Sequence, residues 1–241
     1  MATKDHQSEP IESASETLQR IFDGHGSVLG SQMADESSRY DVLKKTDFPK
    51  PQRTRRIAVA NQKGGVGKTT STVNTAAALA NKGAQVLVID MDPQGNASTA
   101  LGVSHALGEP SVYDVIEGRS DLGDVITVCP DFPTLDVVPA SIDLSGAELE
   151  VVDLPNRNTL LKEALDLYLR QSDKHYDYVF IDCPPSLGLL VINAMCAVTE
   201  MLIPIQAEYY ALDGLGQLIN TIGLVQEHFN PVLLVSTMLV T

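Results

Sequence analysis

The sequence predicts a doubly wound α/β fold with a mostly parallel sheet. From residue 57 onward, short apolar runs alternate with stretches of helical periodicity, which is typical of parallel strands joined by crossover helices. Hydrophobic residues make up 44% of the 241 residues and aromatic residues only 5%, as expected for a sheet of small aliphatic side chains covered by helices on both faces. A chain of this length is expected to form one main domain.

The individual elements follow from the same pattern. An Ala-rich helix is expected at 68–82, with Gly83 as its C-cap. The expected strands are 57–60, 85–90, 135–138, 178–182, 201–205 and 232–240. The other expected helices are 111–117, 158–170, 188–198 and 212–229. The last strand is expected to be buried, and because no helix follows it, we expect the domain to be incomplete at its C-terminus.

Residues 1–55 differ from the rest in composition. They are rich in Ser, Asp, Glu, Gly and Pro and show no sustained pattern, so we expect a flexible N-terminal extension that ends in a basic linker. One stretch, Ser13–Phe22, has apolar residues on one helical face, but a helix this short is marginal by itself in water. The domain that carries the chemistry is expected at 56–241.

Charge is unevenly distributed along the chain. Residues 1–56 carry nine basic and nine acidic side chains, whereas residues 57–241 carry eight basic and twenty-two acidic ones and supply the whole net charge of −14. This acidic body argues against nonspecific nucleic-acid binding by the body as a whole. A basic strip before it could make an auxiliary contact with DNA; its cations are Lys44, Lys45, Lys50, Arg53, Arg55 and Arg56.

Several classes of protein are disfavoured by simple features. No apolar run reaches the ~18 residues that a membrane span needs, and the N-terminus lacks the apolar stretch of a signal peptide. The three cysteines form no CxxC pair, and the five histidines show no metal-ligand spacing. We therefore expect a cytoplasmic protein with no membrane contact, no disulfide and no structural metal.

The segment NQKGGVGKTT at 61–70 lies between a predicted strand and a predicted helix, which is the context of a phosphate-binding loop. Glycines let backbone N–H groups approach phosphates, and the helix N-terminus adds its dipole. Lys68 is expected to reach the β- and γ-phosphates, and the Thr69 hydroxyl to coordinate Mg²⁺. The loop departs from GxxxxGK[ST], because Gln62 takes the first glycine position and a second lysine, Lys63, opens the loop. The predicted nucleotide-binding residues are Gly64, Gly65, Val66, Gly67, Lys68, Thr69 and Thr70.

Acidic side chains follow two further strands. Asp90 and Asp92 come after VLVI, and Asp182 comes after YVFI. Because the carboxyl ends of parallel strands meet at one edge of the sheet, these carboxylates are expected beside the loop. Asp182 fits a Walker-B role in which it holds Mg²⁺ through water, Asp90 joins the predicted metal site, and Asp92 is placed to orient the attacking water. The alternative for each acid is a turn or helix-capping role.

Four motifs in this order resemble the ParA family of chromosome-partitioning ATPases, which have a deviant Walker A motif. They are KGGVGKTT at 63–70, DMDPQGNAST at 90–99, FIDCPPSLG at 180–188 and PIQAEYYALDGLGQL at 204–218. The resemblance covers about residues 56–241. It implies ATP and Mg²⁺ as cofactors, a P-loop ATPase domain, and two switch segments that begin at Asp90 and Asp182.

The resemblance also implies how such a protein works. Lys63 would be the signature lysine that reaches the nucleotide of the other subunit in an ATP-dependent sandwich homodimer. The dimer would bind nonspecific DNA, mainly through the C-terminal region, and so associate with the nucleoid. A ParB-like centromere-binding partner would stimulate the weak ATP hydrolysis that resets the cycle.

Three other classes of protein have the same kind of phosphate-binding loop. A MinD-like membrane-associated positioning ATPase is the first alternative, but such chains lack the PQGNAS run found here at 93–98. A nitrogenase-reductase-like redox protein needs two cysteines per subunit at its dimer face, and Cys129 and Cys196 do not follow the switch strands as expected. A small-molecule kinase is hard to reconcile with Lys63.

Overall fold

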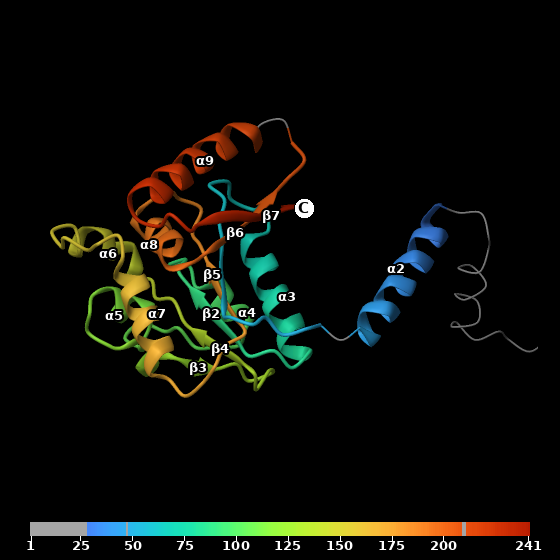
Figure 1. Ribbon diagram of the computed structural model, residues 1–241, viewed down its shortest axis with the longest axis horizontal. Coiled ribbons are helices and arrows are strands. Elements are labelled where there is room, and N and C mark those ends of the chain that lie inside the picture. The colour runs from blue at the N-terminus through green and yellow to red at the C-terminus, as the bar shows by residue number, and fades with distance from the viewer. Residues whose placement is uncertain (1–27, 47, 209–210) are drawn as a thin grey trace, which may run out of the picture. The chain divides into compact units, whose positions relative to one another are not determined.

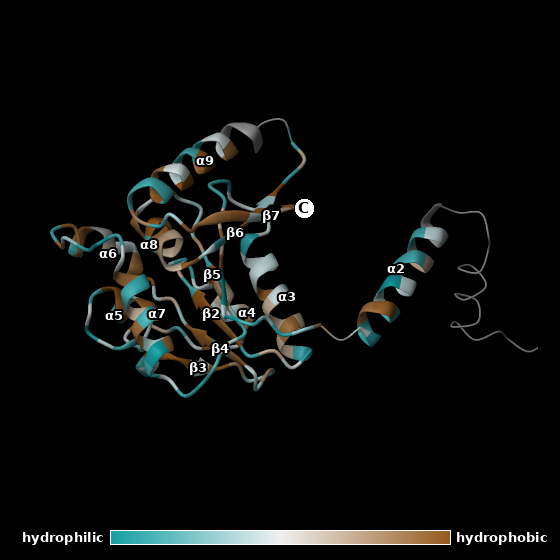
Figure 2. Ribbon diagram, viewed as in Figure 1, coloured by the Kyte–Doolittle hydropathy of each residue, from teal (hydrophilic) through white to brown (hydrophobic). Residues whose placement is uncertain are grey.

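The computed structural model describes residues 28–46, 48–208 and 211–241. The chain divides into two units, 1–48 and 49–241, and each is described by itself. The helix predicted at Ser13–Phe22 lies outside the described residues. The first unit contains helix α2 (Val28–Lys45), which the sequence pattern did not predict. Its residues from 31 onward are exposed, and Figure 2 shows apolar residues interrupted by polar ones along it, so no continuous apolar stripe marks the helix.

The second unit is built on a seven-stranded sheet with the order β3-β4-β2-β5-β1-β6-β7. All paired strands run parallel except β3, which is antiparallel to β4. The predicted doubly wound, mostly parallel fold is therefore confirmed. The strands are β1 (Arg55–Val59), β2 (Val86–Asp90), β3 (Thr127–Val128), β4 (Leu135–Val138), β5 (Tyr178–Asp182), β6 (Glu200–Ile205) and β7 (Leu234–Val240).

Helices cover both faces of the sheet, as Figure 1 shows. The helices α3 and α4 pack on one face, and the others lie on the opposite face. The helices are α3 (Lys68–Asn81), α4 (Asn96–Ala100), α5 (Val112–Ile116), the 3₁₀ turn η1 (Leu122–Val125), α6 (Leu144–Glu150), α7 (Leu160–Gln171), α8 (Leu189–Ala197) and α9 (Ala211–His228). The elements α4, η1, α6 and β3 were not predicted; each has seven residues or fewer and so shows little periodicity, although the equally short α5 was predicted. None of the helices in the described ranges is long and apolar enough to cross a bilayer.

The central strands are buried on both faces, which explains why they read as unbroken apolar runs. In β2, Val86 and Val88 pack toward α3, whereas Leu87 and Ile89 pack into the core on the other face. Helix α3 ends one residue earlier than predicted, at Asn81 with Lys82 as its C-cap. Gly83 follows with φ of +82°, a left-handed conformation that glycine adopts without strain.

The edge strand β7 differs from expectation. It pairs with β6 alone, and its residues are exposed at six positions and half-buried at the seventh, with Met238 54% and Val240 72% exposed. The prediction of a buried strand is therefore wrong. An apolar run alone does not distinguish a central strand from an edge strand, because that difference depends on neighbours that come from elsewhere in the chain.

Strand order brings the site together. β5 lies between β2 and β1, and the register pairs Asp182 with Asp90 on one side and with Val59 on the other. The loop after β1 and the acids that end β2 and β5 therefore share one edge of the sheet.

Candidate nucleotide-binding site

The loop between β1 and α3 has the backbone shape of a phosphate cradle. Gly65 and Gly67 have φ of +74° and +84°, and Gly67 is the N-cap of α3. A Cβ at Gly64 or Gly65 would meet no atom within 4 Å, so at Gly65 it is the left-handed backbone that requires glycine. The loop ends at the N-terminus of a fourteen-residue helix, where free N–H groups and the dipole favour an anion.

Lys68 begins that helix and points back into the loop. Its side chain is only 7% exposed, and its Nζ donates a hydrogen bond to the carbonyl oxygen of Lys63 at 3.2 Å. Burial lowers the pKa of the Lys68 ammonium, while the charges of Asp182 and Asp92 oppose that shift. A buried cation held among carbonyl groups and carboxylates is ready to bind a phosphate.

Asp182 joins β5 to the first turn of α3. Its two carboxylate oxygens accept hydrogen bonds from the hydroxyls of Thr69, at 2.7 Å, and Thr72, at 2.9 Å. Burial raises the pKa of Asp182 to about 7, with the Asp90 charge acting in the same direction and the two threonine hydroxyls opposing it. This arrangement brings together Thr69 and Asp182, which the sequence assigned to the metal.

Asp90 has a different environment from Asp182. One carboxylate oxygen accepts the N–H of Asp92 at 3.1 Å, and the other accepts both the N–H and the hydroxyl of Ser98, at 2.8 and 2.7 Å. Ser98 in turn accepts the N–H of Ala140 at 3.1 Å. Asp90 therefore ties the loop after β2 to the start of α4 and to the segment after β4, and both its oxygens are occupied.

Asp92 lies at the start of that loop and is 8% exposed. Its carboxylate accepts the N–H of Gln94 at 3.0 Å. Gly95 follows with φ of +63°, and a Cβ there would come within 2.6 Å of the His105 ring. His105 also lies 2.9 Å from the Thr99 hydroxyl. The sequence did not single out His105, because its contact with this loop depends on how the chain returns after α4.

Lys63 is held by the segment that follows β6. Its ammonium donates to Gln206 Oε1 at 2.9 Å and to Glu208 Oε2 at 2.5 Å. Gln206 also donates to the carbonyl of Gly65 at 3.3 Å, and Asn61 donates to the carbonyl of Pro204 at 2.7 Å. The sequence pointed to 204–218 as a motif without assigning roles to its side chains. Those roles depend on the pairing of β6 with β1, which no local signal reveals.

These residues fit a nucleotide with Mg²⁺. Gln62, at the start of the loop, has a buried Oε1 oxygen with no hydrogen-bond partner within the described structure. No cluster of three His, Cys, Asp or Glu side chains among the described residues could hold a metal by itself. Mg²⁺ commonly takes one or two protein ligands together with phosphate oxygens and water, so Thr69 and Asp182 suit a metal that arrives with a nucleotide.

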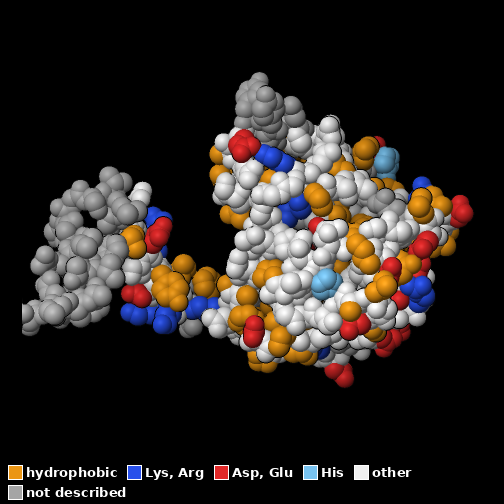
Figure 3. Space-filling model, turned by 180° about the vertical axis from the view of Figure 1, so that it is seen from behind, with side chains coloured by type: hydrophobic (Ala, Val, Ile, Leu, Met, Phe, Trp, Pro, Cys, Tyr) orange, Lys and Arg blue, Asp and Glu red, His pale blue; other side chains and the backbone are white. Residues whose placement is uncertain are grey.

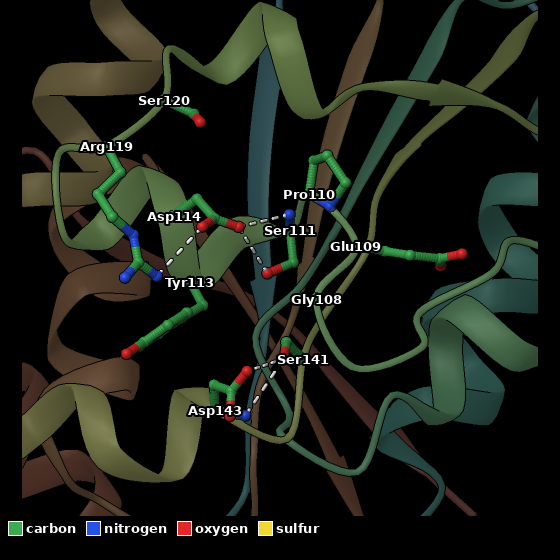
Figure 4. A pocket seen from close by; sticks show the side chains of 10 residues that line it. All are labelled: Gly108, Glu109, Pro110, Ser111, Tyr113, Asp114, Arg119, Ser120, Ser141 and Asp143. Carbon is green, nitrogen blue, oxygen red and sulfur yellow. Dashed lines mark hydrogen bonds and ion pairs between the residues drawn. The ribbon is translucent and has the colours of Figure 1, made fainter.

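A separate polar pocket lies at the start of α5, and Figure 4 shows its lining side chains. Arg119 forms ion pairs there with Asp114 at 3.1 Å and Glu117 at 2.6 Å, and its guanidinium lies over the Tyr113 ring. The one cation is thus neutralised by its neighbours. This pocket is unsuited to phosphates.

Comparisons with known proteins find relatives over most of the second unit. A family model described as an AAA domain matches residues 54–235. The chain is 50% identical over 185 residues to the sporulation initiation inhibitor protein Soj of Bacillus subtilis, covering 77% of this chain and 71% of Soj. It is 46% identical over 175 residues to the chromosome partitioning protein ParA of Caulobacter vibrioides, covering 73% of this chain and 64% of that protein. The chain thus spans about two thirds of the length of these relatives.

Solved structures give the same result. A cobyrinic acid a,c-diamide synthase from Mycobacterium smegmatis, with bound ATP analog and magnesium, is 39% identical with a TM-score of 0.69, covering 77% of this chain and 70% of that one. A plasmid partition protein from Borrelia burgdorferi, bound to AMPPNP, is 25% identical with a TM-score of 0.67, covering 78% of this chain and 76% of that one. With half of its aligned residues identical to those of Soj, the chain belongs to the family of Soj and ParA, the chromosome-partitioning ATPases.

Proposed function

We propose that this chain is an ATPase of DNA segregation that uses ATP and Mg²⁺. The observation that carries the proposal is the hydrogen bond of Thr69 to Asp182 at the mouth of the loop that buries Lys68. These three groups are the side chains that phosphoryl transfer requires: a cation for the phosphates, a hydroxyl for the metal, and a carboxylate behind it.

In this proposal each loop residue has a defined task. The N–H groups of Gly64 to Gly67 and the Lys68 ammonium bind the β- and γ-phosphates. Thr69 is the direct metal ligand, and Asp182 holds the metal through water. Bound Mg²⁺ supplies positive charge that offsets the negative charge developing on the phosphate oxygens. The same charge favours the ionised form of Asp182, whose pKa burial raises.

Hydrolysis needs a group to orient water, and we assign this task to Asp92. Asp92 lies two residues after the buried Asp90. The Asp90 carboxylate accepts hydrogen bonds from the N–H groups of Asp92 and Ser98, which keep the loop in place. Because both oxygens of Asp90 are engaged, we now assign it to positioning rather than to direct metal contact. Asp92 accepts one backbone hydrogen bond and keeps its second oxygen for water.

Lys63 is proposed to act across a homodimer. Phosphoryl transfer spreads charge over the γ-phosphate oxygens, and a cation supplied by the second subunit stabilises it, as an arginine finger does. In the single chain Lys63 is 37% exposed and paired with Glu208, so it must exchange that partner for a phosphate. Hydrolysis then depends on assembly of the ATP-bound dimer.

The names of the relatives support the wider role. Soj and ParA are a sporulation initiation inhibitor and a chromosome partitioning protein, and the Borrelia structure is a plasmid partition protein. We propose that this chain likewise acts with nonspecific DNA, in association with the nucleoid, and with a ParB-like centromere-binding partner that stimulates hydrolysis. The MinD-like alternative would require a membrane-binding segment.

The Mycobacterium relative supports a second candidate function, ATP-dependent amide formation on a small-molecule carboxylate. The two functions differ in whether ATP consumption needs a small-molecule substrate. A partitioning ATPase hydrolyses ATP with protein and DNA partners alone, whereas a synthase consumes ATP only with its acceptor acid and a nitrogen donor.

The test measures ATP hydrolysis and sedimentation of the purified chain with ATP and Mg²⁺. We expect slow hydrolysis without any small-molecule acceptor, and a dimer that forms with ATP but not with ADP. The variant Lys68→Ala should lose nucleotide binding, because the cation that meets the β- and γ-phosphates is gone. Unchanged nucleotide affinity in Lys68→Ala would refute the loop assignment, and turnover that requires an acceptor acid would favour the synthase.

A further inference from the structure

A basic groove lies at the edge of the sheet opposite the nucleotide site, and we define it by Arg53, Arg56, Lys162 and Arg170. The groove has a volume of about 570 Å³. It is bordered by the start of β1, one face of α7, the end of α8, and the segments that lead into β6 and β7. Because these strands begin here, the groove faces away from the loop that follows β1.

Helix α7 presents its cations to the groove by its periodicity. Lys162, Asp166 and Arg170 are spaced four residues apart and share one face, whereas Leu161 and Leu165 are buried against the core. Asp166 forms an ion pair with Arg56 at 2.5 Å, which uses the one acid among the lining residues. The other three cations of the groove, Arg53, Lys162 and Arg170, have no carboxylate within ion-pair distance among the described residues.

Those three cations stand apart in an acidic body. Figure 3 shows Asp and Glu spread over the visible face of this unit, with fewer Lys and Arg among them. Elsewhere in the unit, cations have partners: Lys50 with Asp177, and Lys174 with Asp136. Within the described residues of 49–241, the Lys and Arg side chains with neither an ion pair nor a hydrogen bond are Arg53, Lys162 and Arg170. All three line one groove.

This grouping changes the interpretation of the basic strip. The sequence suggested that the cations from 44 to 56 act together on DNA. In the structure, Lys50, Arg55 and Arg56 have carboxylate partners in Asp177, Glu200 and Asp166. Of the strip's cations in the second unit, Arg53 is the one that remains uncompensated, and α7 supplies its companions.

The apolar residues of α8 and its C-terminus that line the groove are buried. Ala197 and Val198 are each only 2% exposed, whereas Val232, which also lines the groove, is 63% exposed. The C-terminus of α8 would ordinarily repel an anion through its free carbonyls. Here the Asn230 amide donates to the carbonyls of Met195 at 2.8 Å and Val198 at 2.7 Å, which satisfies those acceptors.

We infer that the basic groove is a second anion-binding surface, which takes the phosphate backbone of nucleic acid. The planar guanidinium groups of Arg53 and Arg170 match phosphate oxygens in pairs, and Lys162 adds a point charge. The inference rests on the proposed function in one respect: a DNA-segregating protein meets DNA. The contact carries no sequence information, because phosphates are the same at every base pair.

The experiment measures binding of a mixed-sequence DNA duplex to the 241-residue chain with ATP, over a series of salt concentrations. The variant Lys162→Gln with Arg170→Gln removes two cations from the groove. The control variant Lys82→Gln with Arg157→Gln removes two cations elsewhere and changes the net charge equally. Thermal unfolding and ATP hydrolysis without DNA verify that each variant is folded.

We expect the groove variant to reduce the slope of log K against log salt by about 1.8, since each phosphate contact contributes about 0.9, and the control to leave the slope unchanged. Adding Arg53→Gln should remove about 0.9 more. Equal losses in groove and control variants would show a general charge effect and overturn the inference. Displacement of DNA by polyglutamate at matched charge, through the same residues, would assign the groove to an acidic polypeptide instead.

The two proposals fail in different ways. If the wild-type chain hydrolyses ATP but substitutions in the groove leave its DNA binding unchanged, the groove inference is wrong and the ATPase proposal stands. If the chain neither binds nor hydrolyses ATP, the proposed function is wrong, whatever the groove binds.

Discussion

Lys63 and Glu208 form an ion pair of 2.5 Å between the opening of the phosphate loop and the segment after β6. Their side chains are 37% and 57% exposed, so the pair lies at the surface and its contribution to stability is small. Gln206 donates to the loop carbonyl of Gly65 while it accepts from Lys63. The cation that we propose to cross the dimer is therefore held by its own chain until a nucleotide phosphate replaces its partners.

Replacing Lys63 by Ala should leave nucleotide binding by the monomer within a few-fold of wild type, because Lys68 and the loop amides remain. The ATP-dependent dimer should be lost, since no cation then reaches the second nucleotide. Sedimentation with ATP and a fluorescent-nucleotide titration measure the two properties separately. An unaltered dimer in this variant would show that Lys63 does not act in trans.

Replacing Glu208 by Gln should favour the ATP-dependent dimer, because Lys63 is then released from its ion pair. The change removes an exposed ion pair worth about 0.2–1 kcal/mol in each of the two subunits, so the dimer should form at up to ~30-fold lower protein concentration. Glu227→Gln is the matched control, because Glu227 is exposed on α9 and distant from Lys63 in the chain. If both variants assemble like the wild type, the ion pair does not restrain Lys63.

Replacing Asp92 by Ala should slow hydrolysis by about 10²–10⁴-fold while the affinity for ATP survives, because this carboxylate acts on water rather than on the nucleotide. The ATP-bound dimer should accumulate. Single-turnover hydrolysis and sedimentation of the same sample test the two expectations together. Normal turnover would place the water-orienting role on another residue.

The ion pair between Arg55 and Glu200 predicts a pH-dependent stability. Hydrogen bonding to Arg55, at 2.8 and 2.6 Å, holds the pKa of Glu200 below its usual value of 4.5. A carboxyl with a lowered folded-state pKa stabilises the fold above its unfolded pKa and loses that contribution as the pH falls through the folded value. Glu200→Gln should therefore cost about 0.5–1 kcal/mol of unfolding free energy at pH 7, a small amount because Arg55 is 44% exposed.

Urea unfolding of wild type and Glu200→Gln from pH 7 to pH 3 measures this contribution. The difference between them should be constant above about pH 5 and shrink below 4.5. Glu227→Gln again serves as the control for the loss of one carboxylate charge. A difference that persists unchanged at pH 3 would mean that Glu200 acts through packing rather than through its charge.

The sequence by itself determined the elements whose signals are local. Strands β4 and β5 begin and end at the predicted residues, because buried parallel strands are short apolar runs with clear limits. The phosphate loop was identifiable because positive φ values at Gly65 and Gly67 require glycine, and because a strand and a helix must flank it. The acids after β2 and β5 were predictable for the same reason: parallel strands end at one edge.

The tertiary structure decided what depends on partners distant in the chain. Glu208 is 145 residues from Lys63, and Arg56 is 110 residues from Asp166, so neither pair has a local signal. The same holds for the exposure of β7 and for the grouping of Arg53 with Lys162 and Arg170, which depend on the order of the strands. Short-range periodicity reports how a segment is buried, whereas the neighbour that buries or neutralises a side chain is set by how distant segments pack together.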